Sequence, residues 1–534
     1  MTTTVLDAVT HLLRETGMTT VFGNPGSTEL RMFRNWPDDF TYVLGLQESS
    51  ALAMAAGHAL GTQRAAFVTL HSAGGVGHAL GAVFNAYRDR VPLVIVAGQQ
   101  ARSLLQLRPF LGADEPEQFP RPYVKAARQP QRAADVPAAL AEMHRIAMTH
   151  PRGPVFLSVP EDDWDQPAEP VQPRAVHGGF TADPDALTAL AARLNTCGRP
   201  ALVIGPGVDD EAALPQAVAL AERIRAAVWF SPLSGRSGFP ETHPYFQGIL
   251  PPVAGPLAAC LEPYDVVVAL GAPVFTYHVA DDGPLLAPGT ELFHLDCDPT
   301  QAAWLPTGTS LITTLRPALA QLATLVGPSD RNPPPTRRQP APVNASANNA
   351  LTPELVLDQL HQRLPHNRVL VEEAPSHRDV LHARIPISLP GGFLTTGSGA
   401  LGWGLPLAIG RALADRQRVV CVLGDGSALY SIQALWTAAQ HQAPVTFIVL
   451  DNNGYQAVSA LGRRLGITPV PGTDIHGVNF TALATSFGCP ASYADHSHNL
   501  GTALDHAITS LGDDDGPHLL HLRVTDTAGL LYEP

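Results

Sequence analysis

The sequence predicts an α/β protein with three doubly wound domains, each a parallel sheet covered by helices on both faces. Strand-like apolar runs alternate with segments of helical periodicity along most of the chain, which is the pattern of such sheets. At 534 residues, the chain is long enough for roughly three to four separately packed domains. A Pro-rich polar stretch interrupts the alternation once and predicts a semi-extended linker. We therefore expect domains at 1–175, 182–328 and 351–534, with the linker at 329–350.

The elements follow from local patterns taken in order. Apolar residues with helical spacing begin at Val5, and Gly17 ends this helix before a strand at 19–22. The remaining expected strands are at 42–46, 65–70, 93–97, 155–159, 201–204, 227–230, 266–270, 292–295 and 419–423, and a further one ends at Asp451; the expected helices are at 50–59, 79–87, 134–150 and 431–441.

Composition excludes several classes of partner. The net charge is −14 and the arginines are scattered, which argues against nucleic acid. No apolar run approaches the roughly 18 residues that span a bilayer, and the N-terminus lacks the basic and apolar segments of a secretion signal, so we expect a cytoplasmic protein without a membrane partner. The five cysteines are far apart and never form a Cys-x-x-Cys pair, which predicts buried free thiols.

Two short motifs in the third domain predict a diphosphate and metal clamp. The first, Gly424 to Ser427, follows one strand, and the second, Asn452 to Gly454, follows the next. Asp425 and Asn452 are 27 residues apart, about the length of one crossover, so both should lie at the carboxyl ends of neighbouring parallel strands. Their oxygens, with a backbone carbonyl near Gly454, would suit Mg²⁺ or Ca²⁺. Gly-Asp-Gly-Ser alone is more often an ordinary tight turn than a binding site. The second motif at this spacing favours the binding site.

This pair of motifs resembles the cofactor clamp of thiamine diphosphate (ThDP) enzymes, in which Asp425, Asn452 and the Gly454 carbonyl would hold the metal. Further segments extend the resemblance over nearly the whole chain, to the benzoylformate decarboxylases within the ThDP-dependent decarboxylase family. The first domain would then bind the cofactor pyrimidine, the second would be the middle domain, and the third would bind the diphosphate. The segments that carry the resemblance are Gly23 to Ser27, Leu46 to Glu48, Leu70 to Ala73, Gly271 to His278 and Ala434 to Gln440.

The resemblance implies four catalytic residues. Glu48 would hydrogen-bond the pyrimidine ring nitrogen and so activate the thiazolium carbon, although a lone Glu in this position is commonly just a favourable helix N-terminal residue. Ser27 would bind the substrate carboxylate, His71 would protonate the developing alkoxide, and His278 would supply the proton that releases the aldehyde. Each of these residues alone is weak evidence for a catalytic role, and the four together are much more specific.

The resemblance also implies contacts with the cofactor and the substrate. Leu401 would bend the cofactor, and the Gly399 carbonyl would meet its amino group. Two substrate-pocket positions, Val458 and Leu461, differ from the leucine and phenylalanine of the family, so the pocket is expected to be wider or shifted. Phe110 and Leu111 stand where pyruvate decarboxylases carry a His-His pair, which argues against pyruvate. The remaining implied cofactor contacts are Ser376, Gly426, Ser427 and Tyr455.

The expected function is decarboxylation of an aryl 2-oxo acid to the aldehyde and CO₂. A ThDP-dependent carboligase of the acetolactate synthase or benzaldehyde lyase kind is the alternative, and retention of both His71 and His278 argues against it. A non-catalytic relative is the second alternative, and the presence of Glu48, Asp425 and Asn452 argues against that. The resemblance further implies a cofactor held between two subunits, hence at least a homodimer, with a tetramer favoured.

Overall fold

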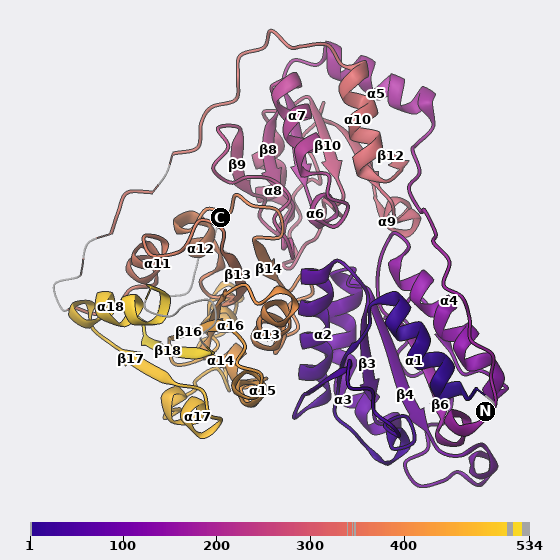
Figure 1. Ribbon diagram of the computed structural model, residues 1–534. Helices are drawn as coiled ribbons and strands as arrows, with labels where there is room; N and C mark the ends of the chain where they lie inside the picture. Colours follow the sequence, from indigo (N-terminus) through magenta and orange to yellow (C-terminus); the bar gives the residue numbers. More distant parts are fainter. Residues whose placement is uncertain (1–2, 339, 344, 346–348, 510–515, 526–534) are drawn as a thin grey trace.

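Three six-stranded sheets form the framework of the molecule, and every strand pair in them is parallel. The computed structural model describes residues 3–338, 340–343, 345, 349–509 and 516–525. Figure 1 shows the three α/β units at the corners of a triangle, with helices on both faces of each sheet. The predicted fold class is confirmed. No helix in these described ranges is both long and apolar enough to cross a membrane.

The first sheet has the strand order β2-β1-β3-β4-β6-β5. Helix α1 begins with a capping box between Thr4 and Asp7 and ends at Gly17, whose φ of 73° suits glycine. Helix α3 begins at Ser72, well before the expected residue 79, because the small residues of its first turns hide the helical periodicity. The elements are β1 (Thr20–Gly23), β2 (Thr41–Leu44), β3 (Ala66–Leu70), β4 (Leu93–Gln99), β5 (Ala127–Arg128), β6 (Val155–Pro160), α1 (Val5–Thr16), α2 (Glu48–Thr62), α3 (Ser72–Arg88) and α4 (Val136–Met148).

The second sheet has the order β12-β11-β10-β7-β8-β9. The sequence did not predict its two edge strands, β9 and β12, because they are only partly buried and lack a continuous apolar run. The elements are β7 (Pro200–Ile204), β8 (Ala227–Phe230), β9 (Phe246–Ile249), β10 (Val266–Leu270), β11 (Glu291–Asp296), β12 (Thr309–Ile312), α5 (Pro184–Thr196), α6 (Pro206–Asp210), α7 (Leu214–Ile224), α8 (Ala254–Leu261), α9 (Pro299–Trp304) and α10 (Leu315–Leu325).

The third sheet has the order β14-β13-β15-β16-β18-β17. The expected helix at 431–441 is wrong at its start, because a short helix already begins at Asp425 and the next begins only at Ala434. The elements are β13 (Val369–Glu373), β14 (Phe393–Thr395), β15 (Val419–Gly424), β16 (Val445–Asp451), β17 (Ala491–Ala494), β18 (His518–Arg523), α11 (Pro353–His361), α12 (Arg378–Arg384), α13 (Gly404–Asp415), α14 (Asp425–Leu429), α15 (Ala434–Gln440), α16 (Gln456–Arg464), α17 (Phe480–Ser486) and α18 (Ser497–Leu504).

Helices α2 and α13 join the first and third sheets through a shared apolar core that includes Leu52 and Ile409. Two glycines let these helices approach closely. A Cβ at Gly57 would lie 2.0 Å from the Leu407 carbonyl oxygen, and one at Gly410 would lie 1.7 Å from that of Met54. A larger residue at either position would force the helices apart.

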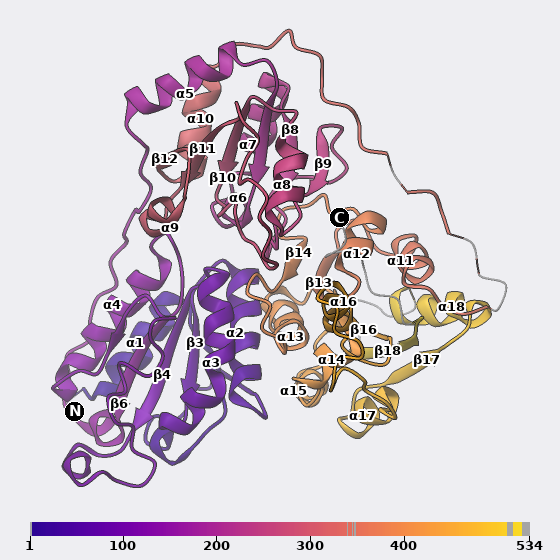
Figure 2. The same cartoon turned by 180° about the vertical axis from the view of Figure 1, so that it is seen from behind.

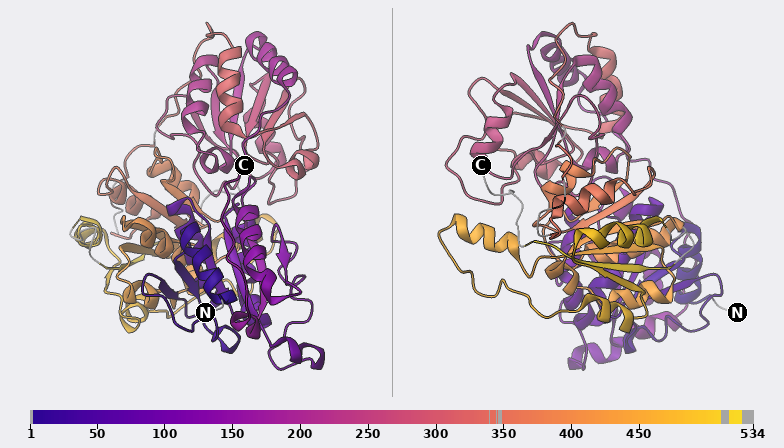
Figure 3. Two further views of the ribbon diagram at one scale, coloured as in Figure 1. Left: turned by 45° about the vertical axis from the view of Figure 1, so that its right-hand side comes forward. Right: turned by 90° about the vertical axis from the view of Figure 1, so that its left-hand side faces the viewer.

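The second unit stands above the other two in all the views (Figures 2 and 3). After α10 the chain runs along the outside of the molecule (Figure 2), and residues 329–338 contain neither helix nor strand. The expected linker covers this stretch, and its residues 339, 344 and 346–348 lie outside the described part. An extended chain fits the proline content of this segment.

Candidate active site

Two adjacent strand ends of the third sheet carry Asp425 and Asn452. Strands β15 and β16 are hydrogen-bonded neighbours whose register pairs Gly424 with Leu450, so both side chains lie at the same edge. Each of the two is only 2% exposed. Asp425 and Asn452 therefore lie at neighbouring strand ends, as their spacing in the sequence predicts.

Two oxygens and the side-chain amide of Asn452 meet at this edge. The end of the Asn452 amide that points at Asp425 lies 3.3 Å from Asp425 Oδ1 and 2.9 Å from the Gly454 carbonyl oxygen. Burial lowers the pKa of His377 to about 4, so its ring is neutral and can accept a hydrogen bond from Asn452 Nδ2 at 3.2 Å. In this orientation the amide oxygen faces the other two oxygens, whereas in the reverse orientation Nδ2 donates to both of them and the amide oxygen accepts a hydrogen bond from His377 Nε2. A divalent cation bound between the three oxygens would offset the repulsion among them. A ligand set made only of oxygens suits Mg²⁺ or Ca²⁺.

The Asp425 carboxylate has the electrostatic character of a cation ligand. Its Oδ1 accepts a hydrogen bond from the Gly426 N–H at 2.8 Å, and its buried Oδ2 has no hydrogen-bond partner among the described residues. Burial, reinforced by the neighbouring Asp451 carboxylate, raises the pKa of Asp425 to about 7. A carboxylate held in this way is costly to ionise alone, and a bound cation would remove that cost.

The predicted diphosphate contacts lie beside these oxygens. A Cβ at Gly426 would come within 2.4 Å of the Tyr455 ring, so only glycine lets the backbone and the ring pack this closely. Ser376 Oγ accepts a hydrogen bond from the Ala457 N–H at 3.1 Å, which leaves its own O–H able to donate to a phosphate oxygen. Ser427 is buried next to them.

A cavity of about 260 Å³ opens over this edge of the sheet. The middle domain contributes His278 from the loop that follows β10, and the backbone N–H of His278 donates to the Pro252 carbonyl at 2.9 Å. Every other predicted residue that lines the cavity comes from the third domain: Ser376, Gly399, Leu401, Asp425, Gly426, Ser427, Asn452, Gly454, Tyr455, Val458 and Leu461.

Glu48 lies in the first turn of α2, after β2 has ended at Leu44. The side chain of Gln47 caps this helix by accepting hydrogen bonds from the backbone N–H groups of Ser49 and Ser50. Glu48 is 14% exposed, and its Oε2 lies 3.1 Å from Nδ1 of the exposed His78. The helix N-terminus therefore fixes the position of a carboxylate that remains reachable from outside.

His71 occupies the position just before α3, and its side chain belongs to a polar group that the sequence did not predict. Its Nδ1 lies 3.1 Å from Glu29 Oε2 and 3.0 Å from Thr28 Oγ1. Glu29 is buried, and burial raises its pKa. A Cβ at Gly26 would lie 2.0 Å from the His71 ring, so the loop that carries the exposed Ser27 packs directly on this histidine.

Phe110 and Leu111 lie on a loop that is hydrogen-bonded to the residue next to His71. The Ser72 hydroxyl donates to the Leu111 carbonyl, and Gln100 Nε2 donates to the Phe110 carbonyl at 2.9 Å. The Phe110 ring is 85% exposed. Residue 72 follows His71 directly, so this loop and the histidine share one part of the first domain.

The predicted residues therefore form two separate groups within one chain. In the described structure, the cavity over β15 and β16 is lined neither by the first-domain group nor by the loop of Phe110 and Leu111. Sequence reasoning missed Thr28, Glu29, His377 and Asp451. A local signal existed for each of them, because Thr28 and Glu29 follow Ser27, His377 follows Ser376 and Asp451 precedes Asn452.

Three domain families match this chain. The N-terminal domain of thiamine pyrophosphate enzymes matches residues 3–119, the central domain matches 187–322, and the C-terminal domain matches 376–522. Thiamine pyrophosphate is another name for ThDP. The match places the oxygen clamp in the C-terminal domain and the Glu48 and His71 groups in the N-terminal domain.

Individual relatives are similar over nearly their whole length. Benzoylformate decarboxylase of Pseudomonas aeruginosa is 40% identical over 512 residues, which cover 95% of this chain and 97% of that protein. The 4-hydroxybenzoylformate decarboxylase of Rhodococcus jostii RHA1 superposes with a TM-score of 0.94 at 38% identity, covering 98% of this chain and 99% of the other. Benzoylformate decarboxylase of Polynucleobacter necessarius superposes with a TM-score of 0.95 at 34% identity, and the coverage of both chains is the same.

The chain belongs to the thiamine pyrophosphate enzymes, and ThDP is its cofactor. Within that family it resembles the benzoylformate decarboxylases, as the relatives above show. Its own residues fit the cofactor, since the oxygens of Asp425 and Gly454 lie beside the Asn452 amide and the Ser376 O–H can donate to a phosphate oxygen. The sequence-based recognition of the family is confirmed.

Proposed function

We propose that this enzyme decarboxylates an aryl 2-oxo acid of the benzoylformate type to the aldehyde and CO₂. The observation that carries the proposal is the cavity in which the oxygens of Asp425 and Asn452 lie together with His278 and the apolar side chains of Val458 and Leu461. Relatives whose names include benzoylformate and 4-hydroxybenzoylformate as substrates support the aryl assignment.

The cofactor would be held by the C-terminal domain. Asp425, Asn452 and the Gly454 carbonyl would coordinate Mg²⁺ or Ca²⁺, which neutralises the diphosphate. Gly426, Ser427, Ser376 and Tyr455 would surround the diphosphate itself. Leu401 would support the cofactor rings, and the Gly399 carbonyl would accept a hydrogen bond from the cofactor amino group.

When bound, ThDP supplies a nucleophilic carbon and an electron sink for the pair that the departing CO₂ leaves behind. Glu48 would share a proton with the pyrimidine nitrogen. Ser27 would hold the substrate carboxylate, and His71 would deliver a proton to the keto oxygen as negative charge develops there. Glu29 and Thr28, in contact with Nδ1 of His71, would hold the ring so that Nε2 faces the substrate. His278 would donate the proton that replaces CO₂ on carbon.

The separation of the two groups supports an oligomer in which two chains complete each site. We propose at least a homodimer, with a tetramer favoured, in which the Glu48 group of one subunit faces the cavity of another. Exposed apolar side chains accompany both groups, namely Leu107 and Phe110 in the first domain and Tyr430 and Val458 in the third. Light scattering after size exclusion measures the mass directly, and an active monomer would contradict this arrangement.

The test of the function is aldehyde release from benzoylformate, compared with pyruvate and a branched aliphatic 2-oxo acid, with ThDP and Mg²⁺ added or withheld. We expect benzaldehyde that depends on the cofactor and little turnover of pyruvate. Turnover of the aliphatic acid alone would reassign the substrate. Acetolactate in place of an aldehyde would favour the carboligase.

A further inference from the structure

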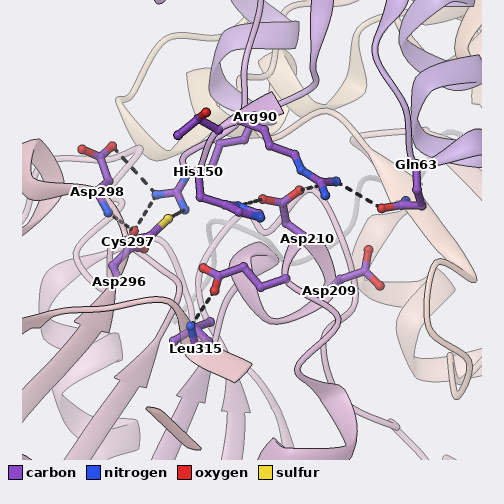
Figure 4. A network of polar contacts seen from close by, with 12 residues as sticks. Gln63, Arg90, His150, Asp209, Asp210, Asp296, Cys297, Asp298 and Leu315 are labelled. Carbon is purple, nitrogen blue, oxygen red and sulfur yellow. Dashed lines mark hydrogen bonds and ion pairs between the residues drawn. The ribbon is translucent and has the colours of Figure 1, made fainter. Parts of the chain in front are cut away.

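A second group of metal-ligating side chains lies between the first and middle domains. His150 follows α4, Glu211 follows α6 and Cys297 follows β11. One ring nitrogen of His150, one carboxylate oxygen of Glu211 and the Cys297 sulfur all lie within 4.8 Å of one another. None of the three lines the active-site cavity. Figure 4 shows His150 and Cys297 within a larger polar network that includes Asp210 and Arg90.

Three buried polar atoms in or beside this group make no hydrogen bond of good geometry among the described residues. Glu211 Oε2 accepts a hydrogen bond from the Leu315 N–H, whereas its buried Oε1 has no partner among the described residues. His150 Nδ1 and Asp210 Oδ2 are 3.4 Å apart, and neither makes a hydrogen bond of good geometry in the part of the chain that the structure describes. Unpaired buried polar atoms cost free energy, and a cation bound at this group would pair with Glu211 and His150.

The charges around the group leave room for such a cation. Arg90 pairs with Asp296 at 2.9 Å, and Arg236 approaches Asp210 at 3.5 Å, whereas no ion pair found among the described residues includes Glu211. Lys125 donates to the backbone carbonyls of Ile146 and Thr149. The carboxylates outnumber the cationic side chains by one: Asp209, Asp210, Glu211, Asp296 and Asp298 face Arg90, Lys125, Arg152 and Arg236.

We propose that His150, Glu211 and Cys297 bind a divalent metal ion of the zinc class, with water as the fourth ligand. Thiolate, imidazole and carboxylate together favour Zn²⁺ or Co²⁺, whereas Mg²⁺ prefers an all-oxygen set such as that at Asp425. Bonds of about 2.0–2.3 Å would hold the ligand atoms within about 4 Å of one another, so the side chains need only contract slightly. The ion would brace the first domain against the middle one.

The group can be reached from solvent. His150 and Glu211 line a cavity of about 540 Å³ between the end of α4 and the start of α10. The same cavity also carries Arg145, Arg174 and Arg316, which repel a free cation. We therefore expect slow uptake, and metal loading should be followed to completion over hours.

The experiment uses Co²⁺ as a spectroscopic substitute for Zn²⁺. The full-length protein is stripped of divalent ions, ThDP and Mg²⁺ are restored so that the cofactor site is filled, and Co²⁺ is titrated. We expect one equivalent per chain to produce a sulfur-to-cobalt charge-transfer band in the near ultraviolet. The all-oxygen site at Asp425 cannot produce this band, because it contains no thiolate. Cys297→Ser should abolish the band, and Cys260→Ser, the matched control in the same domain, should leave it intact.

Further variants separate ligation from folding. Glu211→Gln keeps an acceptor for the Leu315 N–H. It should retain the band but weaken Co²⁺ affinity by about tenfold or more. Loss of a residue that only supports a ligand already costs this much, so loss of a ligand should cost at least as much. Cys297→Ser should still decarboxylate benzoylformate when ThDP and Mg²⁺ are present. If Cys297→Ser fails to fold, His150→Gln and Glu211→Gln decide the question. The proposal is overturned if the wild type gives no band, if Cys297→Ser retains it, if Cys260→Ser also loses it, or if both ligand variants bind Co²⁺ as the wild type does.

Discussion

Glu373 accepts hydrogen bonds from the backbone N–H groups of Trp403 and Gly404, one on each carboxylate oxygen and each at 3.1 Å. Glu373 ends β13 and is 1% exposed, and burial raises its pKa to about 8. Trp403 and Gly404 lie at the start of α13, just after Leu401. A single buried carboxyl therefore ties the strand that leads to Ser376 to the segment that carries Leu401.

Glu373→Ala should destabilise the protein and weaken ThDP binding. It leaves two buried N–H groups without an acceptor, at about 1–3 kcal/mol each, and it frees the Leu401 segment to move. Thermal unfolding and ThDP titration by fluorescence measure the two effects. Glu373→Gln, which keeps one acceptor, should be intermediate. A Glu373→Ala protein with unchanged melting temperature and ThDP affinity would show that this contact positions nothing.

Asp425→Asn should lose most of its affinity for Mg²⁺ and, with it, for ThDP, because the amide cannot supply the negative charge that the cation needs. Calorimetric titration of ThDP at a fixed Mg²⁺ concentration measures the loss. Asp474→Asn removes the same charge from an exposed residue whose backbone pairs with Gly454, and it should bind like the wild type. Equal binding by the two variants would contradict the assignment of Asp425.

The sequence was sufficient to predict that Asp425 and Asn452 lie at adjacent strand ends but insufficient to describe the side chains around them. Crossover length places Asp425 beside Asn452, and this needs no knowledge of side-chain packing. Glu29 could not be connected to His71 in the same way, because the two are brought together by the pairing of β1 with β3 and by the loop at Gly26. The separation of the catalytic residues into two groups also depends on how whole domains pack, which local patterns do not record.

His71→Ala should lower kcat by about 10²-fold or more, the usual contribution of a positioned acid or base. Glu29→Gln should lower kcat less and leave KM almost unchanged, because Glu29 contacts Nδ1 of His71 and not the substrate. Steady-state kinetics with benzoylformate distinguish these roles. A Glu29→Gln variant with raised KM and normal kcat would indicate direct substrate binding instead.

Glu48→Gln should abolish turnover while the protein still folds and binds ThDP, since glutamine fills the same space at the N-terminus of α2 but cannot share a proton with the cofactor. Circular dichroism checks the fold, ThDP titration checks the site, and aldehyde release checks the chemistry. His78→Ala removes the exposed partner of Glu48 and should retain most activity. Full turnover by Glu48→Gln would remove Glu48 from the mechanism.

A buried ion pair between domains predicts how stability depends on pH. His382 Nδ1, in α12, lies 2.8 Å from Glu241 Oε1, which the middle domain contributes, and both side chains are buried. Burial alone would lower the pKa of His382, but the Glu241 carboxylate outweighs it and raises that pKa above the usual 6.5. The folded state therefore binds a proton more tightly than the unfolded state does.

The stabilisation from this pair should be complete below the unfolded pKa of His382 and should disappear as the pH rises through the raised folded value. Glu241→Gln should accordingly lower the melting temperature more at about pH 6 than at about pH 9, with a penalty at the lower pH of roughly 3–5 kcal/mol, typical of breaking a buried pair. The matched control is Glu222→Gln, whose partner is His243 and whose own side chain is 60% exposed. Because water screens that pair, its removal should change the melting temperature little at either pH. A Glu241→Gln penalty that is equal at both pH values would mean that the contact acts through packing and not through the charge of His382.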